Sequence, residues 1–403
     1  MHPPGADTVL VRHGEVGVKT PQVQRKMELQ LRDNLQALLA DRGVPGAVER
    51  QHSRLFVRTD EEHVEAATEA AADAFGVVSA SPAVTVEPTM DAITDALTEA
   101  AREHYQGGTF AVDARRAGEQ DAHPFTSEDI EEEGGSAVWN AVGFEPAVDL
   151  DDPDVTVSVE CRREEAYVFV EKREGPGGLP LGSQYPIVAL ISGGIDSPVA
   201  AWELMKRGCE VVPLYVDLGD FGGPDHRARA AASVGDLARY APSRDMRMRV
   251  APAGETIRLL DDTVGATRML SLRRFMYMLA EELAAEEGAV GIVTGEAVGQ
   301  KSSQTSSNLA TTSPAVDLPV HRPLLTRDKT DITSQARAIG TFQTATVSAG
   351  CNRVAPSHPE TNATLDQVRA AEPADLRERA REAVATLEYD EPIRSERREV
   401  QPR

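Results

Sequence analysis

The stretch VALISGGIDSPVAAWELMKRG, residues 188–208, predicts a strand, a short loop and a helix in immediate succession. Residues 186–191 are continuously apolar, which is typical of a strand buried on both faces of a parallel sheet. Residues 197–208 have the pattern of a helix that ends at a glycine. The stretch therefore predicts an α/β fold, with the loop at residues 192–197 placed where a buried strand ends and a helix begins.

The loop SGGIDS has the chemistry of a phosphate-binding site. Gly193 and Gly194 allow the backbone to approach an anion closely, and the amides and dipole at the start of the helix favour negative charge. Ser192 and Ser197 add hydroxyl donors. Asp196 has the wrong sign for a phosphate unless Mg²⁺ bridges the two, so we expect Asp196 to act through Mg²⁺. A plain glycine turn is the alternative, and the six residues together favour phosphate binding.

The composition describes a large globular protein. A chain of 403 residues is expected to form two or three domains, and its hydrophobic content is 41%. No apolar run reaches the roughly 20 residues that span a bilayer, and the first residues lack the features of a secretory signal. We therefore expect a cytoplasmic protein without a membrane segment.

The chain is strongly acidic, with a formal net charge of −23. Such a charge ordinarily disfavours nucleic acids as partners, because phosphates are held by lysine and arginine. Proteins from a salt-saturated cytoplasm have a similar excess of acidic residues, which they tolerate because salt screens the repulsion between like charges. An RNA-binding surface would have to be a local basic patch. Lysine occurs only at Lys19, Lys26, Lys172, Lys206, Lys301 and Lys329.

The order of elements predicts several domains. Strands predicted at residues 8–18 and 47–59 alternate with helix patterns up to residue 76, which indicates helices packed on an antiparallel sheet. A second series follows up to residue 173. A stretch rich in glycine and proline then reads as a linker. The charged end of the chain reads as helices with a disordered end. The predicted segments are 1–78, 79–174, the linker 175–184, 185–360 and the tail 361–403.

Several motifs resemble one known family. SGGIDS is similar to the PP-loop of the ATP pyrophosphatases, and TFAVDARRAGEQDAHPFTSEDIEEEGG (109–135) resembles the tRNA-binding THUMP domain. IVTGEAVGQKSSQTSSNL (292–309), HRPLLTRDKTDI (321–332) and AGCNRVAPSHP (349–359) follow in the order and near the spacing of the tRNA 4-thiouridine synthetase family, ThiI. The resemblance covers most of the chain, from about residue 9 to about residue 359.

The resemblance implies a fold and a reaction. The expected fold is α/β, with an N-terminal ferredoxin-like α+β unit, a THUMP domain and a parallel-sheet PP-loop ATP pyrophosphatase domain like that of the adenine nucleotide alpha hydrolases. The expected reaction adenylates O4 of a tRNA uridine, at position 8 as the family implies. A cysteine persulfide then transfers sulfur to give 4-thiouridine, releasing AMP and pyrophosphate.

The family's functional residues can be carried over to this sequence. The resemblance places the persulfide on Cys351 and makes Lys329 the lysine near the reacting phosphates, while Arg353 would lower the pKa of the thiol. Cys161 and Cys209 read as packing residues. The implied ATP-binding residues are Leu190, Ile191, Ser192, Gly193, Gly194, Ser197, Tyr215, Val216, Arg273, Gly295 and Gln304. Arg274 is a second candidate for the phosphate-binding role of Arg273. The alternative interpretation is that both arginines lie on a solvated helix face and bind no ligand.

Two basic segments are candidates for binding tRNA. The first contains Arg12, Lys19, Arg25, Lys26 and Arg32, and the second contains Arg115 and Arg116. The alternative to tRNA binding is that these are ordinary surface charges paired with nearby carboxylates, and each such pair contributes little to stability.

The sulfur donor and two other functions stay open. Residues 360–403 contain no cysteine, so the chain resembles family members that lack a rhodanese domain. Sulfur would come from a separate cysteine desulfurase, another carrier or free sulfide. The alternative functions are a PP-loop ligase for a small molecule, and sulfur transfer to a small ThiS-like carrier protein for thiamine synthesis. Family members are often homodimers, which the resemblance implies as an option here.

Overall fold

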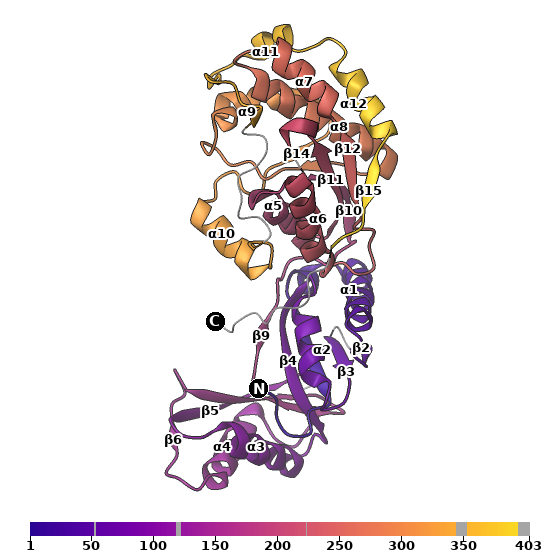
Figure 1. Ribbon diagram of the computed structural model, residues 1–403. Coiled ribbons are helices and arrows are strands. Elements are labelled where there is room, and N and C mark those ends of the chain that lie inside the picture. Colours follow the sequence, from indigo (N-terminus) through magenta and orange to yellow (C-terminus); the bar gives the residue numbers. More distant parts are fainter. Residues whose placement is uncertain (52–53, 118–121, 223, 344–352, 394–403) are drawn as a thin grey trace. The chain divides into compact units, whose positions relative to one another are not determined.

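The computed structural model describes all residues except 52–53, 118–121, 223, 344–352 and 394–403, and it divides into two compact units, Met1–Pro180 and Leu181–Arg403 (Figure 1). We describe each unit by itself. In the described part of the chain, no helix combines the length and the apolar character needed to cross a bilayer.

The first unit is built on one large sheet with helices against it. Its strands are β1 (Thr8–His13), β2 (Ala47–Gln51), β3 (Arg54–Arg58), β4 (Val77–Val86), β5 (Thr109–Arg116), β6 (Ala147–Val148), β7 (Val155–Cys161), β8 (Ala166–Phe169) and β9 (Arg173–Glu174). Its helices are α1 (Pro21–Asp41), α2 (Val64–Ala72), α3 (Met90–His104) and α4 (Ser127–Ala141), with a 3₁₀ turn η1 (Glu15–Val18). The strand order is β2-β3-β1-β4-β8-β7-β5-β6, and β9 pairs with β4.

Strand β4 joins the two halves of this sheet. It pairs antiparallel with β1 on one side and with β8 on the other. One apolar cluster contains residues of α1 and α2, and a second contains residues of α3 and α4. The two strand and helix series expected from the sequence therefore share one continuous sheet.

Two elements of the first unit differ from the sequence prediction. Residues 47–59 were expected to form one strand, but they form the antiparallel pair β2 and β3. The expected strand 8–18 ends at His13, and η1 follows. A Cβ atom on Gly14 would lie 2.8 Å from Cγ2 of Val78, so the chain approaches β4 too closely at this point for a larger residue.

The second unit contains a sheet with parallel strands. Its strands are β10 (Gln184–Leu190), β11 (Cys209–Asp217), β12 (Met248–Pro252), β13 (Ile292–Val293), β14 (Val320–His321) and β15 (Glu388–Asp390). Its helices are α5 (Asp196–Lys206), α6 (Pro224–Ala238), α7 (Gly254–Thr263), α8 (Arg268–Glu287), α9 (Ser306–Thr312), α10 (Lys329–Ala338), α11 (Leu365–Ala371) and α12 (Leu376–Ala385), with 3₁₀ turns η2 (Gly219–Phe221), η3 (Ser302–Gln304) and η4 (Ser313–Ala315). The strand order is β14-β13-β10-β11-β12-β15, and only β15 is antiparallel to its neighbour in this described sheet.

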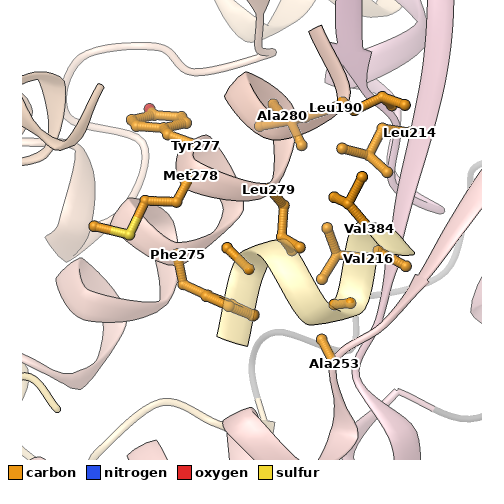
Figure 2. Packing of buried hydrophobic residues seen from close by; sticks show 14 of the residues in the cluster. Leu190, Leu214, Val216, Ala253, Phe275, Tyr277, Met278, Leu279, Ala280 and Val384 are labelled. Atoms are coloured by element: carbon orange, nitrogen blue, oxygen red, sulfur yellow. The ribbon is translucent and has the colours of Figure 1, made fainter. Parts of the chain in front are cut away.

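Helices α8 and α12 cover one face of this sheet. Figure 2 shows Leu190, Leu214 and Val216 of the strands beside Leu279 of α8 and Val384 of α12. All five side chains are buried. Because side chains alternate along a strand, the residues between them point to the opposite face, and α5 and α6 both pack against β11. The strands are therefore buried on both faces, as their continuous apolar runs predict.

The C-terminal segment is part of this unit. Helices were expected in the tail, and α11 and α12 are observed, but β15 was not expected. It pairs with β12, and Arg227 of α6 binds it through Asp390 and Glu388, with three N···O distances of 2.7 Å. The end of the chain that was expected to be disordered, residues 394–403, lies outside the described residues.

Candidate functional site

The loop between β10 and α5 is held closed by its two serines. The Ser192 amide donates to Oγ of Ser197 at 2.8 Å, and the two hydroxyl oxygens are 3.1 Å apart. The Gly194 amide donates to Oγ of Ser192 at 3.3 Å. The loop therefore lies at the carboxyl end of β10 and at the start of α5, as the sequence predicted.

The strand ends beside the loop form its floor. Leu190 pairs with Leu214, and the Ile191 amide donates to the Leu214 carbonyl at 2.9 Å. Tyr215 and Val216 follow directly on β11, and all of these side chains are buried. The structure thus brings four of the predicted ATP-binding residues, Leu190, Ile191, Tyr215 and Val216, to the same edge of the sheet, where α/β folds bind nucleotides.

Gly295 touches the backbone of the loop's last residues. A Cβ atom at this position would lie 2.6 Å from the carbonyl carbon of Asp196 and 2.7 Å from the Ser197 nitrogen. Any side chain would collide with the first turn of α5. The loop after β13 can therefore approach the phosphate-loop helix only because residue 295 is glycine.

A buried carboxylate next to Gly295 organises Arg273. Glu296 is 1% exposed and binds Arg273 through Oε1, while Arg322 and Tyr277 donate to Oε2 at 2.7 and 2.5 Å. Burial acts to raise the pKa of Glu296, but the charges of Arg273 and Arg322 and the hydrogen bonds outweigh it and lower the pKa. With its amide oriented to satisfy both partners, Gln304 accepts from Arg273 at 2.9 Å.

The two neighbouring arginines of α8 have different surroundings. Arg274 is 3% exposed and forms a bidentate pair with Glu372, at 2.8 and 3.0 Å, and also donates to the Thr311 carbonyl. Arg273 points instead to the cluster of Glu296 and also donates to Ser303 at 3.0 Å. Neither arginine lies on a solvated helix face, and Arg274 joins α8 to the residue that follows α11.

Lys329 reaches the loop from another helix. It is the first residue of α10, and its Nζ lies 2.5 Å from Oδ1 of Asp196. Just before α10, Arg327 donates to Glu203 of α5 at 2.8 Å, which fixes the start of α10 beside α5. The structure therefore brings together two of the three predicted catalytic residues, which lie 133 positions apart.

The third predicted catalytic residue, Cys351, lies outside the described residues. The chain after it is anchored in the second unit, because Val354 is fully buried in the core and its carbonyl accepts from Arg268 at 3.2 Å. The thiols of Cys161 and Cys209 are free, and burial raises the pKa of both. Cys209 begins β11, so it stands at the opposite end of that strand from the loop.

The predicted tRNA-binding residues are all in the first unit but do not form one patch. Arg25 and Lys26 are exposed near the start of α1, and Lys19 is half-buried between η1 and α1. Among the described residues, neither Arg25 nor Lys26 has an ion-pair partner. Arg115 and Arg116 pair with successive residues of β7, so they lie on opposite faces of the sheet.

Arg12 lies on the sheet face with Arg115, together with Arg54 and Arg162, which the sequence analysis missed. Arg12, Arg54 and Arg162 surround Glu160 at 3.9, 3.3 and 2.9 Å, and Arg115 lies opposite Glu160 in register. We call Arg12, Arg54, Arg115 and Arg162 the sheet-face arginines. Burial lowers the pKa of Arg12 to about 10, with the three other arginine charges adding to the shift and Glu160 opposing it.

Aromatic rings lie beneath these arginines. The Arg12 guanidinium is 4.7 Å from the ring centre of Phe169, and that of Arg162 is 5.4 Å from the ring centre of Phe56. The sequence signal was weak, because the four arginines come from segments far apart along the chain. The available clue was the spacing of Arg54 and Arg58, which places both on one face of a strand together with Phe56.

Known proteins match this chain along nearly its whole length. Residues 8–81 match the ThiI ferredoxin-like domain, residues 87–171 the THUMP domain and residues 182–375 the thiamine biosynthesis protein family ThiI. A "Probable tRNA sulfurtransferase" of Halobacterium salinarum is 61% identical over 387 residues, covering 96% of this chain and 97% of the relative. The chain belongs to the ThiI family.

Further relatives agree with this assignment. The ThiI chain is 37% identical to a "Probable tRNA sulfurtransferase" of Methanosarcina acetivorans, over 90% of this chain and 88% of the relative. Its fold matches the crystal structure of a 4-thiouridine synthetase in complex with RNA and with bound ATP. That match has a TM-score of 0.84 and 27% identity, and it covers 96% of this chain and 99% of the other.

These findings confirm the family and the fold expected for the ThiI chain, with its ferredoxin-like, THUMP and PP-loop parts. They also confirm the predicted enzyme class, a tRNA sulfurtransferase. The individual site residues and domain boundaries stay predictions.

Proposed function

We propose that this enzyme uses ATP to adenylate O4 of a tRNA uridine, at position 8 as the family resemblance implies, and then replaces that oxygen with sulfur. The observation that carries the proposal is the contact of Lys329 with Asp196 at the phosphate loop. It joins an anion-binding loop, a carboxylate and a cation at the carboxyl edge of a parallel sheet. Family membership supplies tRNA and ATP as the reactants.

The first step needs charge neutralisation at the phosphates. O4 of the uridine attacks the α phosphorus of ATP, the bond to the β-phosphate oxygen breaks, and pyrophosphate leaves. The amides of residues 192–197 and the Lys329 ammonium would bind the phosphate oxygens and stabilise the charge that develops on them. The carboxyl ends of β10 and β11, at Leu190, Ile191, Tyr215 and Val216, would hold adenosine through their backbone groups, so that the phosphates point to the loop.

Asp196 fits the role of an Mg²⁺ ligand. Its side chain is about a quarter exposed at the loop, and Lys329 binds only Oδ1, so Oδ2 is free to bind a cation. Mg²⁺ is usually bound through one or two carboxylates together with substrate phosphates. When bound, Mg²⁺ would neutralise phosphate charge.

The second step delivers sulfur. The terminal sulfur of a Cys351 persulfide attacks C4, the C4–O4 bond breaks, and AMP leaves with the former uridine oxygen. An external thiol then cleaves the remaining S–S bond and releases 4-thiouridine. Cys209 is unsuited to that cleavage, because β11 separates it from the loop by roughly 25 Å of extended chain. Arg353 would favour the Cys351 thiolate.

The sheet-face arginines are the proposed contact surface for the tRNA backbone. Crowded guanidinium groups around one carboxylate are stabilised when phosphate anions approach, and the rings beneath them support the guanidinium planes. Arg25 and Lys26 would add unpaired charges. A tRNA substrate also supports a cytoplasmic location.

A thiolation assay tests the proposal. Purified protein, unmodified tRNA, ATP, Mg²⁺, a reducing thiol and a cysteine desulfurase with free cysteine, which supplies persulfide sulfur to Cys351, are incubated in high salt, and 4-thiouridine is followed by its near-ultraviolet absorbance. A parallel mixture contains sulfide in place of the desulfurase and cysteine. The proposal predicts product with the wild type and none with Asp196→Ala or Cys351→Ser. Product with Cys351→Ser in the desulfurase mixture would contradict the persulfide step, and product with Cys351→Ser in the sulfide mixture would mean that sulfide attacks C4 directly. No product with the wild type, despite conversion of ATP to AMP on another substrate, would favour the small-molecule ligase.

A second assay addresses the thiamine alternative. A small carrier protein with a C-terminal glycine replaces tRNA in the same mixture, and mass spectrometry follows its C-terminus. The proposed function predicts an unchanged carrier, whereas a thiocarboxylate at its C-terminus would add sulfur transfer to a carrier.

A further inference from the structure

Helix α6 packs directly against the phosphate loop. A Cβ atom on Gly193 would lie 3.2 Å from the His226 carbonyl oxygen and 3.5 Å from both Cβ and Nε of Arg229. Gly193 is the first glycine of SGGIDS, so the Arg229 side chain runs alongside the loop at its centre. The sequence analysis did not include α6 in the site.

The Arg229 charge has no carboxylate partner in the described part of the chain. Its Nε donates to the Asp225 carbonyl at 3.1 Å, and its NH2 group lies 2.9 Å from Nδ1 of His226. Arg227, two residues earlier on the same helix, is instead bound by both Asp390 and Glu388. An arginine without a carboxylate is unexpected in a chain of net charge −23, and here it lies beside an anion-binding loop.

His226 holds Arg229 as a neutral acceptor. Burial, together with the charges of Arg229 and Arg353, lowers the pKa of the His226 imidazole. A neutral ring with an unprotonated Nδ1 accepts a hydrogen bond from the guanidinium. The imidazole and the Asp225 carbonyl thus orient Arg229 without cancelling its charge.

We propose that Arg229 is a phosphate-binding residue of this enzyme. Its guanidinium contacts the pyrophosphate portion of ATP and stabilises the negative charge of this leaving group. The proposed adenosine site lies at the strand ends, whereas Arg229 lies at the phosphate loop. Arg229 would therefore contact the phosphates and not the base. Guanidinium groups bind phosphate oxygens through paired, charge-assisted hydrogen bonds. The inference rests on the proposed function, because it requires ATP on this loop.

Calorimetric titration of the full chain in high salt tests the assignment. Dissociation constants for ATP with Mg²⁺ and for inorganic pyrophosphate are measured with the wild type, Arg229→Gln and Arg229→Lys. The control is Arg379→Gln, an arginine of α12 in the same unit that pairs with Asp375, the residue just before that helix. We expect Arg229→Gln to weaken both ligands by about tenfold or more, the loss typical of a charge-assisted hydrogen bond. Arg229→Lys should recover part of the loss, and Arg379→Gln should bind like the wild type.

Several results would overturn the inference. Unchanged affinity for ATP and pyrophosphate in Arg229→Gln would do so, as would an equal loss in Arg379→Gln. A loss confined to tRNA affinity would assign Arg229 to the RNA instead. If Arg229→Gln fails to fold, as judged by its Tm, the affinities of Arg229→Lys for ATP and pyrophosphate are compared with those of the wild type instead, and unchanged affinities would overturn the inference. A wild type that binds ATP through Arg229 but makes no 4-thiouridine would contradict the proposed function and leave this inference standing.

Discussion

At the scale of single residues, Gly295 sets how closely two loops approach at the nucleotide site. Adding a methyl group would place it within 2.8 Å of three backbone atoms of Asp196 and Ser197. Backbone atoms in a packed turn cannot move aside cheaply, so the start of α5 would have to shift. We predict that Gly295→Ala weakens ATP binding by about tenfold and costs about 1–3 kcal/mol of stability.

The matched control for this substitution is Gly265→Ala. A Cβ atom on Gly265 meets no other atom within 4 Å, so this variant should bind ATP like the wild type. Affinity can be measured by calorimetry and stability by thermal unfolding. Equal behaviour of the two variants would show that the close approach at Gly295 has no role in binding.

Glu296 gives a second prediction at this scale, through pH. Its folded pKa lies below the ordinary value of 4.5, so its contribution to stability is present above pH 4.5 and is lost as the pH falls through the folded pKa. Glu296→Gln leaves Arg273 and Arg322 without their anion and should cost about 3 kcal/mol at pH 7. The difference in unfolding free energy between wild type and variant should narrow below pH 4.5. A difference that stays constant from pH 7 to pH 4 would contradict this assignment.

At the scale of elements, β15 ties the C-terminal segment to α6. Arg227 forms a bidentate pair with Asp390, and both side chains are partly exposed, at 30% and 26%. A double-mutant cycle of Arg227→Gln and Asp390→Asn should therefore give a coupling energy of about 1 kcal/mol, as for well-oriented pairs near the surface. Urea unfolding of the four proteins measures it, and additive effects would mean that the pair contributes nothing.

The elements also show what the sequence could predict. The buried strand of residues 186–191 and the helix after it were predictable, because a continuous apolar run and a terminal glycine are local signals. The strand Glu388–Asp390 was not predictable, because it is short and charged and is specified by its partners β12 and Arg227. The same reasoning applies to the site: motifs identified SGGIDS and Lys329, but Arg229 approaches the loop only through the packing of α6.

At the scale of the whole molecule, an acidic chain concentrates arginines on one face of the first unit's sheet. We predict that Arg12→Gln combined with Arg54→Gln weakens tRNA binding by at least about tenfold and reduces its dependence on salt. The control is Arg102→Gln, an exposed arginine paired with Glu99 on α3, which should bind normally. Filter binding at several salt concentrations provides the comparison. Equal affinities for the double variant and the wild type would exclude this face as the RNA surface.

The most direct test of the whole account follows one oxygen atom. Transcribed tRNA carrying ¹⁸O at O4 of its uridines is thiolated with unlabelled ATP, a cysteine desulfurase with cysteine and a reducing thiol, and the released AMP is analysed by mass spectrometry. Attack of O4 on the α phosphorus leaves that oxygen on the phosphate when the C4–O4 bond breaks, so each AMP should carry one ¹⁸O atom. AMP without the label, released as 4-thiouridine forms, would show that ATP activates something other than the uridine oxygen and would contradict the account.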